Sequence, residues 1–166
     1  MRGCIHVELC PDLPSRFVLC VCSVYLFPSF DCPSNLTAAQ QVDQTLVGMQ
    51  GVPFGMLWFD IEQNPGSGWG TDADANHAWL VEGIAEAIKQ IGVARVGIYT
   101  SPWGWVPMGS YADLSSYPLW WPNYDDQLSY DDFKPFAGWV QSDLVMKQFN
   151  YNTTVCELYT DVNWHP

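Results

Sequence analysis

Short apolar runs alternate with helical or loop stretches from Val24 onward, and this alternation restricts the fold more than any other feature. Such runs predict strands where turn residues bound them. The run Met56–Ile61 is almost continuously apolar, as expected of a parallel strand buried on both faces. We expect the strands at residues 24–27, 56–61, 96–100, 118–121, 144–149 and 158–162. The rhythm predicts a single α/β domain of the βα-repeat type.

Two of the intervening stretches predict helices. Residues 37–49 have apolar side chains at helical spacing behind Thr37, a residue type that caps helix N-termini. After a glycine-rich loop at 64–70, the stretch from Asp72 to Gly92 has the strongest helical pattern of the chain. Its apolar stripe predicts a core-facing surface and consists of Leu80, Ile84, Ala87, Ile88 and Ile91. No strong helix is expected between residues 101 and 138.

The charge is strongly negative, with six Lys and Arg against eighteen Asp and Glu and a formal net charge of −12. Nucleic acids and anionic membranes both attract basic residues, so neither is an expected partner. The excess of acid can be a solubilising surface or an adaptation to an acidic compartment. Nine Trp residues also need explaining, because Trp stacks on sugar rings as well as filling cores.

The N-terminal region holds four of the six cysteines, Cys4, Cys10, Cys20 and Cys22. With His6 they form a conceivable metal cluster, but their spacing matches no established zinc pattern, and unpaired or disulfide-bonded cysteines are the favoured interpretation. Residues 17–27 are as long as a signal-peptide core but are interrupted by Cys and Ser, so we do not predict a signal peptide. The triplets that begin at Asn35 and Asn152 fit N-glycosylation sites of an exported protein.

Two acids, Asp60 and Glu62, follow the apolar run at 56–61. Side chains alternate along a strand, so both acids face the same way, with β-carbons about 6–7 Å apart. A close pair of carboxyl groups suits glycosidic cleavage, which needs a proton donor and negative charge near the developing cation. The same pattern can bind a divalent cation or cap the following loop.

Polar and aromatic side chains gather again where the later strands end. Any single aromatic is most simply explained as core, but their repetition at successive strand ends favours a ligand cleft. The residues are Tyr99, Thr100, Trp103, Trp105, Trp120, Trp121, Tyr124, Gln148, Asp161 and Asn163.

The ordered series LWFDIE, GIYTSPWGW, LWWPNYD, KQFN and YTDVNW resembles the glycoside hydrolase family 25 lysozymes, especially those of nematodes and amoebae. The resemblance implies a (β/α) TIM-like barrel that cleaves the β-1,4 bond between N-acetylmuramic acid and N-acetylglucosamine in peptidoglycan. It implies Glu62 as general acid, Asp60 as the partner that stabilises the positive centre or orients the acetamido group, and Asp161 as the acid of the last strand. Four positions match residues that line the sugar cleft, namely Tyr99, Trp120, Tyr124 and Gln148. No metal or organic cofactor is implied.

The start of the chain departs from that family, whose members begin with a strand bearing an Asp in a D-x-S setting. Asp12 does not fit this pattern. We therefore expect an atypical segment at 1–23, in which residues 17–22 can supply a substitute strand, and a lysozyme-like partial barrel at 24–166. The expected protein is a monomeric, secreted or lysosomal or phagosomal hydrolase. The alternatives are a non-catalytic saccharide-binding or vestigial protein, and a chain that does not fold stably.

Overall fold

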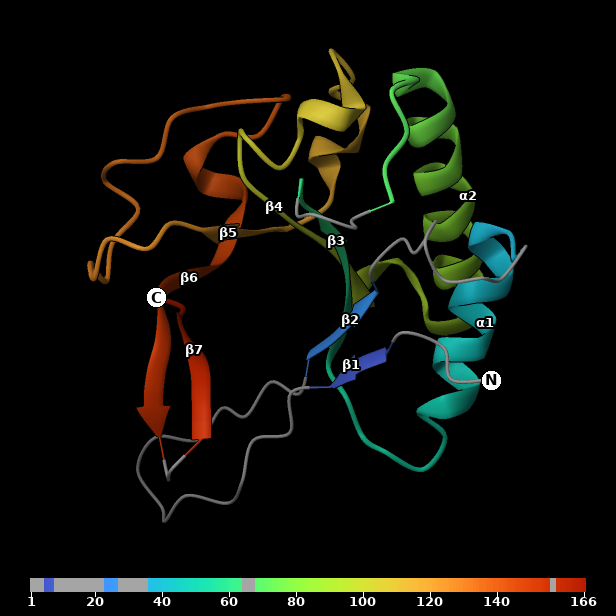
Figure 1. The fold of residues 1–166 in the computed structure, drawn as a ribbon, viewed down its shortest axis with the longest axis horizontal. Coiled ribbons are helices and arrows are strands. Elements are labelled where there is room, and N and C mark those ends of the chain that lie inside the picture. The colour runs from blue at the N-terminus through green and yellow to red at the C-terminus, as the bar shows by residue number, and fades with distance from the viewer. Residues whose placement is uncertain (1–4, 8–22, 27–35, 64–67, 156–157) are drawn as a thin grey trace.

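A computed structural model describes residues 5–7, 23–26, 36–63, 68–155 and 158–166 (Figure 1). One seven-stranded sheet runs through it in chain order, from β1 to β7. Its strands are β1 Ile5–Val7, β2 Ser23–Leu26, β3 Met56–Ile61, β4 Val96–Thr100, β5 Leu119–Pro122, β6 Leu144–Val155 and β7 Leu158–Trp164. Strands β2 to β6 are parallel, whereas β1 and β7 each pair antiparallel with their neighbour.

Two α-helices, α1 Ala38–Gly48 and α2 Ala73–Ile91, pack side by side against one face of the sheet (Figure 1). Both begin at side-chain caps: Thr37 forms a capping box with Gln40, and the Asp72 carboxylate accepts the N–H groups of residues 74 and 75. Helix α2 ends at Gly92, which adopts a φ of 84° that favours glycine. These helices confirm the sequence predictions for both stretches.

The predicted strands are confirmed to within a few residues, with one large difference in length. Strand β6 was expected to end at residue 149 but continues to Val155, because its polar second half pairs with β7 in a hairpin. Between Ser101 and Gly138 the described chain forms no α-helix, as expected; apart from β5, it holds the short 3₁₀ turns η2 Val106–Met108 and η3 Asp113–Ser116. Two further 3₁₀ turns, η1 Val93–Arg95 and η4 Gln141–Asp143, lead into β4 and β6.

The sheet is open in the part of the chain that the structure describes, since β1 and β7 are its two edges. The fold is thus mixed α/β, and the described strands do not close into a barrel. Strand β1 supplies a seventh strand beside β2. The substitute strand expected at 17–22 lies outside the described residues, as do the four N-terminal cysteines and Asn35.

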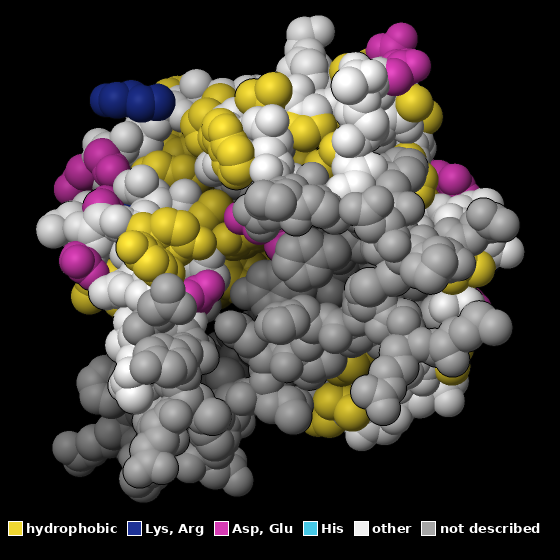
Figure 2. Space-filling model, viewed as in Figure 1, with side chains coloured by type: hydrophobic (Ala, Val, Ile, Leu, Met, Phe, Trp, Pro, Cys, Tyr) yellow, Lys and Arg dark blue, Asp and Glu magenta, His cyan; other side chains and the backbone are white. Residues whose placement is uncertain are grey.

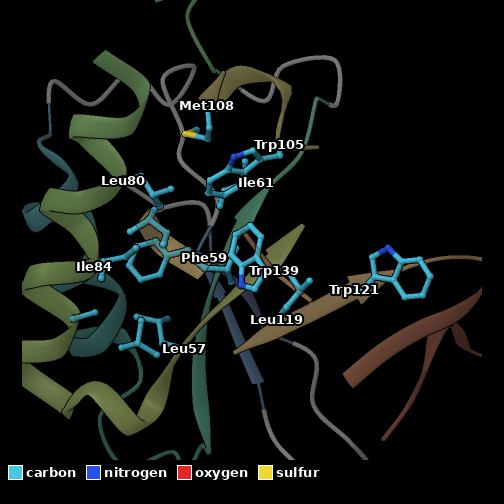
Figure 3. Close-up of a cluster of buried hydrophobic side chains, with 14 of the residues drawn as sticks. Leu57, Phe59, Ile61, Leu80, Ile84, Trp105, Met108, Leu119, Trp121 and Trp139 are labelled. Carbon is cyan, nitrogen blue, oxygen red and sulfur yellow. The ribbon is translucent and has the colours of Figure 1, made fainter. Parts of the chain in front are cut away.

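The main core lies between the sheet and the two helices (Figure 3). Leu57, Phe59 and Ile61 of β3 point into it, and Leu80 and Ile84 of α2 pack against them. Trp105, Met108 and Trp139 extend this core under the loops that follow β4 and β5. Trp105 and Trp121 therefore belong to the core, whereas Trp103 is 58% exposed.

The opposite face of the sheet carries a second, smaller cluster formed by Trp58, Tyr99 and Trp120. The ring of Trp58 lies directly over Gly97, its register neighbour on β4. A β-carbon at Gly97 would lie 2.3 Å from that ring, which is closer than atoms can approach. Glycine at 97 is therefore required for the Trp58 ring to occupy this position.

We expect Gly97→Ala to lower the free energy of unfolding by about 1–3 kcal/mol, because Trp58 must move out of its rotamer. Chemical denaturation of the purified chain measures this. Gly70→Ala is the matched control, since its added β-carbon would meet the nearest atom at 3.6 Å, an ordinary contact. Equal stability of the two variants would contradict the close packing of Trp58 on Gly97.

Candidate active site

The face of the sheet opposite the helices brings four predicted site residues together. Asp60 on β3 and Tyr99 on β4 are register neighbours, and Tyr99 is in turn the neighbour of Trp120 on β5. Gln148 on β6 reaches the same place, because its side chain accepts a hydrogen bond from the Tyr99 hydroxyl. Alternation along each strand thus sends apolar side chains to the helices and these polar and aromatic ones to the opposite face.

Asp60 is nearly inaccessible, with 2% of its surface exposed. Its Oδ1 atom accepts no hydrogen bond in the described structure. Burial, together with the negative charge of Glu62, raises the pKa of Asp60 well above its ordinary value. The buried acid of the pair therefore favours its neutral form.

Glu62 lies just beyond the end of β3 and is partly exposed. The backbone before it is fixed, since Thr100 Oγ1 donates a 2.7 Å hydrogen bond to the carbonyl of Ile61. Gly104 packs on the same carbonyl, where a β-carbon would lie only 2.4 Å from the oxygen. The acid pair thus consists of the buried carboxyl group of Asp60 and the partly exposed one of Glu62. Both lie at the end of β3, where hydrogen bonding and packing hold the backbone in place.

Tyr99, Tyr124 and Gln148 form one hydrogen-bonded group. Gln148 Oε1 accepts from Tyr99 Oη at 2.6 Å and from Tyr124 Oη at 2.7 Å. Both hydroxyls therefore donate to the same amide oxygen, which fixes the orientation of the Gln148 side chain. Burial and the negative charges of Glu62 and Asp60 raise the pKa of Tyr99, which keeps it a neutral donor.

Trp120 and Asp161 complete the predicted set. Trp120 is 1% exposed, so its ring forms the floor of the site, and its Nε1 donates a 2.9 Å hydrogen bond to Asn163 on β7. Asp161 precedes Asn163 by two positions on β7 and is partly exposed. Burial raises the pKa of Tyr124, its hydrogen bond with Tyr99 lowers it in part, and the charges of Asp161, Glu62 and Asp60 raise it further.

Lys147 is the residue that the sequence did not reveal. It is completely buried on the helix side of β6, 5.1 Å from the centre of the Trp121 ring. Its Nζ donates to Asp125 at 2.7 Å and to the carbonyl of Ser129 at 3.0 Å. The only available signal was a lysine within an apolar run in a chain of few basic residues, next to Gln148.

On the face shown in Figure 2, acidic side chains border a hydrophobic area. A pocket of about 450 Å³ opens beside Gln63, the residue after Glu62, and is lined in part by Trp69 and Thr71. Among the described residues, no group of three or more His, Cys, Asp or Glu is arranged to hold a metal ion, and no helix is long and apolar enough to cross a membrane.

Comparison with known proteins gives consistent matches. A family model described as "Lysozyme-like protein 1" matches residues 18–149. The chain is 38% identical over 143 residues to probable GH family 25 lysozyme 4 of Dictyostelium discoideum, covering 86% of this chain and 63% of that protein. It is 34% identical over 147 residues to lysozyme-like protein 5 of Caenorhabditis elegans, covering 86% and 65%. Counting factor 50 of Dictyostelium discoideum is also 34% identical, over 86% of this chain and 46% of that protein.

Solved structures share the fold at low sequence identity. A muramidase from Trichobolus zukalii superposes with a TM-score of 0.59 at 18% identity, covering 81% of this chain and 63% of that one. A bacterial lysozyme from Streptomyces coelicolor gives a TM-score of 0.60 at 17% identity, covering 86% and 65%. The chain spans less than two thirds of the length of each of these proteins.

Asp60→Asn should stabilise the protein increasingly as pH rises. The pKa of Asp60 is higher in the folded protein than in the unfolded chain, where it is about 4. The contribution of Asp60 to the free energy of unfolding is therefore complete below about pH 4 and is lost as the pH rises through the folded-state pKa. Asparagine cannot ionise and avoids that loss. We expect the melting temperature of the variant, relative to wild type, to increase between about pH 4 and pH 7.

The control is Asp131→Asn, which makes the same chemical change at an exposed carboxylate. Its melting temperature relative to wild type should change little over this range. If the difference in melting temperature between Asp60→Asn and wild type does not change with pH, burial of Asp60 does not alter its protonation.

Proposed function

The chain belongs to the lysozyme-like family that includes the glycoside hydrolase family 25 lysozymes, and we propose that it hydrolyses the β-1,4 bond between N-acetylmuramic acid and N-acetylglucosamine in peptidoglycan. The observation that carries the proposal is the acid pair at the end of β3. Glu62 is partly exposed and Asp60 is buried beside it, and glycosidic cleavage uses such a pair of carboxyl groups, one as proton donor and one near the developing positive centre.

In this proposal Glu62 protonates the leaving oxygen of the scissile bond. In the free protein, burial keeps the proton of the pair on Asp60 at mildly acidic pH. A saccharide that covers Glu62 excludes water from it, which favours its neutral form and prepares it to donate. The proton of the pair then passes from Asp60 to Glu62, which donates it to the leaving oxygen. The Asp60 carboxylate that remains stabilises the positive centre or orients the acetamido group, and Asp161 adds negative potential from β7.

The saccharide is held by the aromatic and amide groups of the same face. Trp120 forms the floor, and the half-exposed ring of Tyr124 presents a face on which a sugar can stack. Tyr99 and Gln148 supply hydrogen bonds from positions fixed by their contact with each other. The net charge of −12 suits an acidic location, and we propose a secreted, lysosomal or phagosomal enzyme that acts on bacterial walls. We also propose that the sheet belongs to the (β/α) barrel of its family.

A second candidate is saccharide binding without turnover. Two similar proteins of Dictyostelium discoideum are named Counting factor 50 and Counting factor 45-1 rather than lysozymes. The aromatic floor and the Tyr99–Gln148 pair can bind a sugar without the complete acid set. Affinity for oligosaccharides of N-acetylglucosamine with no release of reducing ends would favour this candidate.

Glu62→Gln should reduce clearing of bacterial cell walls by about 100-fold or more, because the proton donor is lost while its shape is kept. Turbidity assays between about pH 4 and pH 7 measure this. The matched control is Glu82→Gln on the exposed surface of α2, which should keep wild-type activity. Wild-type clearing by Glu62→Gln would remove Glu62 from the catalytic role.

A further inference from the structure

The segment after β5, which we call loop 123–126, is tied to strand β6 by two backbone hydrogen bonds. The N–H of Asn123 donates to the carbonyl of Gln148 at 2.9 Å, and the N–H of Asp126 donates to the carbonyl of Phe149 at 3.1 Å. These bonds hold both ends of the loop against strand β6. Tyr124, between the two anchors, is the loop residue whose hydroxyl reaches Gln148.

One anchor residue has a strained backbone. Asp126 adopts a φ of 58°, a left-handed conformation that few residues other than glycine occupy. The side-chain amide of Asn150 donates to its carboxylate. Strain of this kind persists where the surroundings fix it, and it is concentrated at functional sites.

A buried cation holds the centre of the loop. Lys147 Nζ lies 2.7 Å from Asp125 and 3.7 Å from Asp132, so it joins loop 123–126 to the residues that follow it. The lysine side chain is 0% exposed, whereas those of Asp125 and Asp132 are 25% and 51% exposed. A buried ion pair is usually no more stabilising than apolar residues of the same size. The charge of Lys147 is therefore better explained by the loop position that it fixes than by stability.

Lys147 and Gln148 are adjacent on β6 and face opposite sides of the sheet. Gln148 contacts the hydroxyl of Tyr124 on the site side, while Lys147 binds the next loop residue, Asp125, from the other. Loop 123–126 is thus held by side chains from both faces of β6, Gln148 on one and Lys147 on the other. The ring of Tyr124 is 47% exposed and has an aromatic neighbour, Tyr151, at 5.2 Å.

We propose that Lys147 is a positioning residue of the saccharide site: through Asp125 it holds loop 123–126 on β6 and so sets the place of the Tyr124 ring. Lys147 does not touch the sugar. The identity of the ligand rests on the proposed function, but the holding of the loop does not.

The test is Lys147→Met, which keeps length and apolar packing against Trp121 but removes the charge. We expect hydrogen exchange of backbone amides in residues 123–133 to become faster while exchange in α2 is unchanged, since the loop opens locally. The KM for cell walls should rise about tenfold with kcat changed little, because a stacking contact is lost. In a Tyr124→Ala background, Lys147→Met should raise KM no further.

Lys89→Met on the surface of α2 makes the same chemical change at an exposed lysine and should alter neither readout. Unchanged exchange at 123–133 in Lys147→Met would overturn the proposal, as would faster exchange throughout the protein, or KM effects that add to those of Tyr124→Ala. If the wild type clears no cell walls, the proposed function fails, and the exchange experiment alone decides whether Lys147 holds the loop.

Discussion

Strand β3 is buried on both faces, and the rest of the molecule is arranged around that constraint. Its odd-numbered residues, such as Phe59, meet the helices, while Trp58 and Asp60 face the other way. A shift by one residue would place a carboxyl group beneath α2 and an apolar ring at the site. The absence of a side chain at Gly97 fixes Trp58 beside the acid, so the packing of an aromatic ring and the position of Asp60 depend on the same register.

The sequence was sufficient to predict those features that depend on residues close together in the chain. The Thr37 and Asp72 caps, the stripe of α2 and the acids after β3 all lie within a few positions of the elements that they define. The sequence could not predict which tryptophans belong to the site and which to the main core. Trp120 and Trp121 are adjacent, yet one forms the site floor and the other joins the main core, because a strand alternates and the sequence does not state which face is which.

Features that depend on distant partners could not be predicted. Lys147 is buried only because Asp125 and the Ser129 carbonyl, about twenty positions earlier, reach its ammonium group. The length of β6 is set by its pairing with β7, since the polar residues beyond 149 resemble a loop on their own. Whether the described sheet is open or closed likewise depends on which strands pair, and the sequence of a single strand does not reveal this. The site therefore combines a predictable rigid floor with a rim held by tertiary contacts.

Strand order in the sheet follows strand order in the chain, so each strand pairs with the one synthesised just before it. Such a sheet can grow at one edge as the chain leaves the ribosome, without waiting for a distant partner. Asp60 is then still hydrated when β3 first pairs with β2. It loses its water only when the rings and amides of β4, β5 and β6 cover it, and the apolar residues of these strands complete the helix-side core at the same stage. The unfavourable burial of the acid thus coincides with the burial of these apolar side chains, which offsets its cost.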